Sequence, residues 1–344
     1  MGMYCGIDLA SKSTSICVIN SRRQVKLEQS VATEERALSK VFRQFQGLTC
    51  IVEAAPLAEW VSEIIEKCGH KVTIVCPRKA KAVLSGNSKK KTDKRDARGL
   101  AELCKSGWYE AVHRKSGKAR ELRSYLTARK QLVESSLAIG SSIRGILRAH
   151  GVRLSAGTDE ATFVERAREG AQRLPLKAQE GIEELLKAFA LLHAQQCAMY
   201  RKLRNEAPKN EETARLLDID GVGPATAVAF VATIDDPNRF ETGEKVASYL
   251  GLTPAVYQSG ETEYRGRITK TGDALLRWLL VEAAHCLLTR TQTNSALKQW
   301  GLRLAEKKGL GKARVAVARR LCIIMWKIWK DEESYNPEAL PLAA

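Results

Sequence analysis

The chain has 344 residues, enough for two or three domains with a sizeable buried core. It carries 56 Lys and Arg against 39 Asp and Glu, a formal net charge of +17 at pH 7. This excess favours a polyanionic partner, although a basic protein without such a partner would show it too. No apolar run approaches the ~20 residues of a membrane span, and the start MGMYCGIDLA lacks a secretory-signal layout, so we expect no membrane contact.

The nine cysteines are scattered singly, with no CxxC pair and no nearby His at metal-ligand spacing. Most have apolar neighbours, as in CIVEA and TIVCP, so we interpret them as reduced core residues. This usage indicates a reducing compartment, which we take to be the cytoplasm.

The first hundred residues alternate strand and helix patterns. Strands are expected at 4–10, 14–20, 24–32, 48–54 and 70–77, and amphipathic helices at 34–45 and 57–69. The second and third strands are expected to pair antiparallel through the turn NSRR. Strands interleaved with helices predict a mixed α/β sheet covered by helices.

Two long helices are expected next, at 118–150 and 177–207, separated by a variable segment. Leu122, Leu126, Val133, Leu137 and Leu147 lie near one helical seam of the first. The pair is typical of an antiparallel coiled-coil arm, and a plain helical bundle within one protomer explains the pattern equally well.

The last third begins with LLDIDGVGPATAVAF, which has a helix-hairpin-helix layout. Gly221 and Gly223 would let backbone N–H groups approach a phosphate, whereas the alternative is an ordinary helix connection with a glycine cap. A hairpin-like stretch at 251–273 and three helices at 274–290, 294–308 and 312–330 follow. We expect domains at 1–112, 113–210 and 211–344.

Four acids are placed where they could converge. Asp8 and Glu53 each end an apolar strand, and Asp93 and Asp96 open a helix within the basic stretch KKKTDKRDAR, with a spacing that puts both on one helix face. Converging carboxylates repel one another unless a divalent cation neutralises them, and hard oxygen ligands favour Mg²⁺ or Mn²⁺. The alternative is structural, because Asp93 suits a helix N-cap and Asp96 the helix dipole.

In this order, GIDLAS, IVEA and KTDKRDARGLAELC resemble the N-terminal domain of the DEDD transposases of insertion sequences, which is similar to RuvC-type resolvases. The resemblance implies an RNase-H-like fold and an acidic tetrad of Asp8, Glu53, Asp93 and Asp96 that holds the metal. Lys89, Lys90, Lys91 and Arg95 would then hold the phosphates brought to it. The chain departs from the family after its glutamate, where it reads EAAPLAEW.

The stretch GLTPAVYQSGETEYRGRITKTGDALLRWLLVEAA matches the C-terminal domain of the same transposases. In that family the serine of the SG pair is a nucleophile, which implies this role for Ser259; on residue chemistry alone, a Ser before Gly is usually a turn residue. No His near Ser259 supplies a base. In the family, the metal-bound acidic tetrad is brought to the serine, and we expect this tetrad to come from another protomer. Arg265, Arg267 and Lys270 could neutralise the phosphate, or could form a solvated basic turn.

The fold class expected is therefore α/β plus α: a RuvC-like mixed sheet with helices, a helical coiled-coil arm, and a mostly helical C-terminal domain with a helix-hairpin-helix. The resemblance implies a nucleoid-associated DNA recombinase that links Ser259 to DNA and is guided by a noncoding RNA. The helical arm would join protomers into a dimer or tetramer. Two alternatives are a RuvC-like junction nuclease that uses water, and a nucleic-acid binder without catalysis.

Overall fold

The computed structural model describes residues 2–78, 80, 93–155, 159–259 and 262–339. The side chains of Asp93, Ser259 and Arg265 and the whole of Lys89, Lys90 and Lys91 lie outside the described part. Contacts divide the chain into two compact units, Met1–Lys115 and Ser116–Ala344. The division into three domains stays a prediction.

The first unit is built on one five-stranded sheet with the strand order β3-β2-β1-β4-β5. The strands are β1 (Met3–Leu9), β2 (Ser13–Asn20), β3 (Val25–Ala32), β4 (Thr49–Glu53) and β5 (Lys71–Val75). β1, β2 and β3 pair antiparallel, whereas β4 pairs parallel with both β1 and β5. The predicted mixed sheet and the turn between the second and third strands are confirmed.

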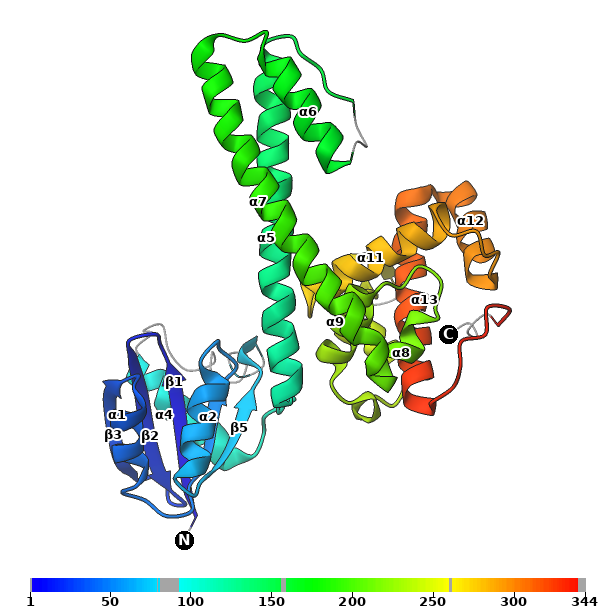
Figure 1. Ribbon diagram of the computed structural model, residues 1–344. Coiled ribbons are helices and arrows are strands. Elements are labelled where there is room, and N and C mark those ends of the chain that lie inside the picture. The colour runs from blue at the N-terminus through cyan, green and yellow to red at the C-terminus, as the bar shows by residue number, and fades with distance from the viewer. Residues whose placement is uncertain (1, 79, 81–92, 156–158, 260–261, 340–344) are drawn as a thin grey trace. The chain divides into compact units, whose positions relative to one another are not determined.

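Helices cover both faces of this sheet (Figure 1). The helices are α1 (Glu35–Phe42), α2 (Ala58–Lys67) and α4 (Asp93–Ser106). The side chains of Cys5 and Ile7 pack in one core with α1 and α2, while Tyr4 packs against α4. This alternation is the two-residue period of a strand, so even-numbered positions of β1 face α4.

Gly6 allows α4 to cross directly over β1. A Cβ atom at Gly6 would lie 2.1 Å from the backbone oxygen of Ala97 and 2.2 Å from the backbone nitrogen of Ala101. Both neighbours are backbone atoms of α4, so no side-chain movement could relieve the overlap. The absence of a side chain at this one position therefore fixes how closely the helix approaches the sheet.

The second unit begins with a pair of long helices. These are α5 (Gly117–Ala149) and α7 (Leu176–Glu206), with α6 (Glu160–Ala171) between them. α5 and α7 run antiparallel, since the Tyr125 hydroxyl donates to the backbone oxygen of Met199 and Gly140 lies against Phe189 (Figure 1). Their existence is confirmed, α6 was not foreseen, and the coiled-coil assignment stays a prediction.

Leu137 does not belong to the seam expected for α5. Its side chain is 63% exposed, whereas Leu126 and Leu147 on the same helix are buried. The helix is long enough that its inward face changes partners, from the C-terminal body around Leu126 to the core formed with α6 around Leu147. A single seam along the helix was therefore the wrong expectation.

The rest of the second unit is a helical body with one two-stranded hairpin. Its elements are η1 (Ala207–Lys209), α8 (Glu211–Leu217), α9 (Pro224–Ile234), η2 (Pro237–Arg239), α10 (Gly243–Tyr249), β6 (Pro254–Ser259), β7 (Thr262–Ile268), α11 (Ala274–Thr289), α12 (Ala296–Lys308) and α13 (Leu310–Asp331). α9 is buried along nearly its whole length, and α11 and α13 share its core. Among the described helices, none has both the length and the apolarity to cross a bilayer.

Replacing Gly6 by Ala should destabilise the first unit by about 2–3 kcal/mol or more, since the added methyl group overlaps α4 backbone. Urea unfolding measures the change. Gly145→Ala is the matched control: Gly145 is an exposed mid-helix position of α5 with nothing within 4 Å of a built Cβ. That change should stabilise by roughly 0.5–1 kcal/mol. Equal stabilities for the two variants would contradict the close approach of α4 to β1.

Candidate functional site

The strand register brings Asp8 and Glu53 to one edge of the sheet. β1 and β4 are parallel, and Gly6 pairs with Ile51 and Ile7 with Val52. One residue further along each strand come Asp8 and Glu53, near the carboxyl ends of β1 and β4. Alternation puts Asp8 on the face of Gly6 and Glu53 on the face of Ile51, which are both covered by α4.

The direction of α4 carries its acidic end toward the same edge. At its far end, the Cys104 thiol donates to the backbone oxygen of Thr49, 3.2 Å away, near the start of β4. Ala97 lies over Gly6, farther along the sheet. The first turn of α4, with Asp93 and Asp96, therefore extends toward the end where Asp8 and Glu53 lie. Asp96 is half-buried there, and Arg95 beside it is exposed.

The donor chemistry of this edge suits a hard divalent cation. All four candidate ligands are carboxylates, the oxygen donors that Mg²⁺ and Mn²⁺ prefer. Among the side chains that the structure describes, no group of three or more His, Cys, Asp or Glu is close enough to hold a metal ion, and the side chain of Asp93 is not among them. The elements thus bring the acids to one edge, while metal binding by all four stays a prediction.

Pro56 does not disturb the backbone that carries Glu53. Glu53 pairs with Val75 of β5, and the N–H of the next residue, Ala54, donates to the backbone oxygen of Val75 at 2.9 Å. Pro56 lies beyond this bond, in the turn that leads into α2. The departure from the family pattern therefore falls after the point where β4 is fixed.

Ser259 is the last residue of β6, at the far end of the hairpin. It pairs with Thr262, while Pro254 pairs with Ile268 at the hairpin base. Arg267 and Lys270 are exposed on the returning strand and after it. The side chains of Ser259 and Arg265 are outside the described set, so their roles stay predictions.

The hairpin base is held by an interlock of two glycines and one arginine. Gly251 and Gly272 both have positive φ, +67° and +74°, and a Cβ on either would lie within 2.2 Å of backbone oxygen. One Arg277 nitrogen, Nη1, donates to the backbone oxygens of Leu250 and Thr271 at 3.0 and 2.8 Å. These bonds tie the segments before and after the hairpin together, so the strand that carries Ser259 starts from a fixed base.

Gly221 is required for packing inside the protein. It has φ +82°, and a Cβ there would lie 2.6 Å from the backbone oxygen of Ala283 in α11. Gly223 caps α9 with extended backbone, and Pro224 follows at the first helical position. α8 and α9 are consecutive helices joined by a short turn, whereas the helix-hairpin-helix assignment and its binding to phosphate stay predictions.

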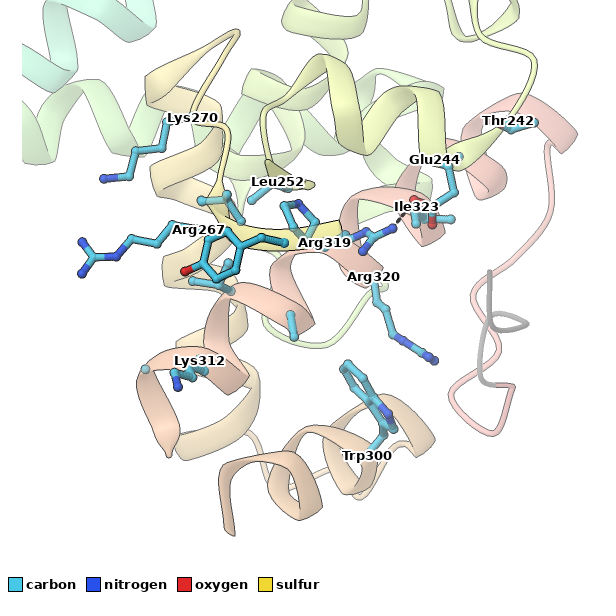
Figure 2. Close-up of a pocket in the computed structure, with 18 residues that line it drawn as sticks. Thr242, Glu244, Leu252, Arg267, Lys270, Trp300, Lys312, Arg319, Arg320 and Ile323 are labelled. Carbon is cyan, nitrogen blue, oxygen red and sulfur yellow. Dashed lines mark hydrogen bonds and ion pairs between the residues drawn. The ribbon is translucent and has the colours of Figure 1, made fainter. Parts of the chain in front are cut away.

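Sequence reasoning missed a basic pocket beside the hairpin. The pocket has a volume of about 1050 Å³ and lies among β7, α10, α12 and α13 (Figure 2). Trp300, Lys312 and Arg320 line it together with Arg267 and Lys270. The alternating basic and apolar segment GKARVAVARR at 311–320 was the signal available in the sequence. The sequence did not show which other elements would pack beside this helix to form a pocket.

Comparison with known proteins matches both units to transposases. A model of IS110-type DEDD transposases matches residues 5–151, and one described as "Transposase IS116/IS110/IS902 family" matches residues 213–300. The "Probable family 20 transposase" of Pseudomonas aeruginosa is 26% identical over 340 residues, covering 96% of this chain and 98% of that one. The "Transposase for insertion sequence element IS1111A" of Coxiella burnetii is 27% identical over 354 residues, covering 96% of this chain and 90% of that one.

A mixed sheet with acids at one edge, followed by a helical unit that matches a transposase model, defines an insertion-sequence transposase. The chain belongs to the IS116/IS110/IS902 family of DEDD transposases. Transposases of this family cut DNA, so the protein binds DNA and acts on it, and the DEDD domain implies a divalent metal.

Asp96→Asn should lower metal-dependent DNA cleavage on the order of 10²-fold or more, the cost of removing one group that stabilises charge in an active site. Folding stability should be unchanged or slightly higher, because one fewer acid relieves repulsion. Cleavage assays and thermal melting measure the two effects. Glu102→Gln on the same helix is the control: its partner Arg23, 3.2 Å away, is largely exposed, so little should change. Marked destabilisation with cleavage retained would favour the capping role.

Arg277→Met should destabilise the second unit by about 2–3 kcal/mol, since two backbone oxygens lose a charged donor. DNA cleavage should fall as well, because the hairpin base loosens. Urea unfolding followed by tryptophan fluorescence and a cleavage assay measure these changes. Arg303→Met, at an exposed position of α12, is the control and should behave as the wild type. Wild-type stability in Arg277→Met would show that the interlock does not hold the hairpin.

Proposed function

We propose that this transposase moves its insertion sequence by forming a covalent link between Ser259 and DNA. The observation that carries the proposal is the hairpin, which places Ser259 at the end of a strand whose base is fixed by Gly251, Gly272 and Arg277. The matched family model covers this hairpin, at residues 213–300.

The reaction conserves the number of phosphate esters. The Ser259 Oγ attacks a phosphorus atom of one DNA strand, the Oγ–P bond forms, and the bond from that phosphorus to the departing strand's oxygen breaks. The serine proton is removed and the departing oxygen takes up a proton. A hydroxyl of the exchanged strand then attacks the serine phosphoester, which rebuilds a phosphodiester and releases Ser259. Because no ester is lost, the cycle needs no ATP.

The acidic edge of the first unit would serve this chemistry as a metal site. Asp8, Glu53, Asp93 and Asp96 would hold Mg²⁺ or Mn²⁺, supported by their carboxylate chemistry and by the strand register and helix direction that bring them to one edge. When bound, such an ion supplies positive charge to a phosphate under attack. Asp96 and Glu53 are half-buried, so water screens the charges of their carboxylates less than it would at an exposed position.

Basic side chains would bind the polyanions that the reaction brings together. Arg267 and Lys270 are exposed next to the hairpin, and with Arg265 they would neutralise charge on the attacked phosphate. Lys89, Lys90, Lys91 and Arg95 would do the same near the acidic edge. Gly221 and Gly223 are proposed to present backbone N–H groups to a phosphate from the α8–α9 turn.

A guide RNA and an assembly of protomers complete the proposal. The +17 charge is enough to bind RNA as well as DNA, and the RNA would choose the donor and target sites, as the resemblance implies. The paired helices α5 and α7 would join protomers into a dimer or tetramer, so that one protomer's acids serve another's serine. Removal of residues 122–205 would then abolish assembly and leave the first unit folded.

The second candidate function is a RuvC-like nuclease that hydrolyses DNA with metal-activated water. The observation that favours it is the acidic edge, whose elements all belong to the first unit and need no serine. Under this hypothesis the second unit only binds nucleic acid.

Co-expression of the protein with its element and flanking DNA, followed by denaturing gels for protein–DNA adducts, tests the proposal. The wild type should give an adduct, Ser259→Ala should give none, and the exposed Ser248→Ala control on α10 should match the wild type. DNA cut without any adduct, equally by Ser259→Ala, would establish the nuclease. Binding without cutting in every variant would leave only a nucleic-acid binder.

A further inference from the structure

Apart from Arg267 and Lys270, the residues that line the basic pocket beside the hairpin have no role in the serine reaction. Its wall combines strand β7 with three helices that are distant in sequence, α10, α12 and α13 (Figure 2). The charged side chains that line it are Arg267, Lys270, Lys312, Arg319, Arg320 and Glu244. Among the described residues of the lining, five cations against one anion give a charge of 5 − 1 = +4 in a concave space, where the field of like charges adds up.

Charges within the pocket are arranged to favour an anion. Arg319 forms an ion pair with Glu244, so the single acid is already neutralised (Figure 2). Burial lowers the pKa of Arg320 below its ordinary value, and the neighbouring charge of Arg319 lowers it further. Arg267 extends from β7, and Lys312 extends from the first turn of α13, the helix that also carries Arg319 and Arg320 (Figure 2). A polyanion entering here would meet an excess of positive charge from the β7 segment and from α13.

Aromatic surfaces line the same pocket. The Arg320 guanidinium lies over the Trp300 ring, 4.1 Å from its centroid, and together they form a flat cationic surface. Tyr264 of β7 is 67% exposed, a large exposure for a tyrosine that packs beside a pocket. Val315, Ala316 and Ile323 add apolar surface to the wall of the same pocket. Flat, apolar and cationic surfaces together are the composition that recognises nucleobases joined by phosphates.

We propose that this pocket binds an unpaired stretch of nucleic acid, with bases stacked on Tyr264 and on the Trp300–Arg320 surface and phosphates held by Lys312. The faces of bases in a double helix are already covered by their neighbours, so rings placed for stacking are useful only to unpaired bases. The volume of about 1050 Å³ accommodates a few nucleotides and no duplex. DNA and RNA both present bases joined by phosphates, so binding to single strands of each distinguishes the two ligands.

The pocket also lies along the strand that leads to Ser259. Tyr264 pairs with Tyr257, two residues before Ser259, which is about 7 Å along an extended strand. On the proposed function, a strand whose bases occupy the pocket would present a phosphate close to Ser259. Binding of bases here would thus position a locally unpaired strand for attack, and the same hairpin would supply both Tyr264 for the bases and Ser259 for the phosphate.

Fluorescence anisotropy with the Ser259→Ala full chain tests the proposal without any dependence on cleavage. The probes are a labelled oligo-dT of about 12 nucleotides, an oligo-rU of equal length and a duplex of mixed sequence. Tyr264→Ala and Trp300→Ala should each weaken single-strand binding by about 5- to 150-fold, the range for losing one stacked base, and leave duplex binding within about twofold. Lys312→Glu should weaken single-strand binding several-fold and reduce the slope of log binding constant against log salt concentration by about one or more.

Matched controls are Trp108→Ala for the loss of an exposed aromatic side chain and Lys307→Glu for charge reversal outside the pocket. Thermal melting is to be used to check that Trp300→Ala folds. Tyr264 and Lys312 are exposed, so their substitutions should leave the fold intact. If the pocket variants bind only oligo-dT more weakly, the pocket binds DNA, and if they bind only oligo-rU more weakly, it binds RNA. If binding of both probes falls equally, the pocket binds either nucleic acid through the bases and phosphates that both contain.

Wild-type binding by Tyr264→Ala, Trp300→Ala and Lys312→Glu would overturn the proposal, and so would losses that are equal for duplex and single strand. Failure of the serine reaction has a different signature: no adduct in the wild type, with the single-strand binding differences intact. An adduct in the wild type, together with pocket variants that bind normally, would overturn only the pocket.

Discussion

The first unit depends on one contact, the crossing of α4 over β1 at Gly6. Backbone lies on backbone there, with no side chain between, so the distance and direction of the helix are set by hard-sphere contact. Because α4 starts with the acids and runs away from the sheet edge, this crossing directs Asp93 and Asp96 to the end where Asp8 and Glu53 lie. In the proposed metal site, this rigid packing contact would oppose the repulsion between the carboxylates, and a bound cation would relieve it.

The second unit uses the same device for a different purpose. Gly221 lies against the backbone of α11, and Gly251 and Gly272 interlock the segments that flank the hairpin. Each contact leaves no room for a methyl group, so each fixes a turn against a helix or another turn. The result is a hairpin with a firm base in a body whose core is built on the buried helix α9. In the proposed reaction, such a base would help to position Ser259, because positioning is a large part of what activates a serine.

Positive charge is distributed in two ways that have different consequences. Exposed cations such as Arg95 and Lys270 attract phosphate from any nucleic acid, and they supply affinity with little discrimination. In the pocket, Arg320 is stacked on Trp300 and Arg319 is paired with Glu244, so the charge is held in fixed geometry beside flat surfaces. Fixed charge next to aromatic rings selects for exposed bases, which gives the protein a means to distinguish an opened strand from a duplex.

The sequence by itself determined most of the elements of this protein, although not α6, because strand and helix periods, glycine turns and acidic strand ends are local signals. It also determined the family, since three acidic motifs and the serine stretch occur in order along the chain. Only the tertiary structure decided that Gly221 packs on α11, that Leu137 leaves the helical seam, and that α6 fills the tip of the long helices. It also decided the pocket, whose side chains at Tyr264, Trp300 and Arg320 come from three elements. The physical reason is that a concave site is made by contacts between residues far apart in the chain, and no local period records which faces will meet.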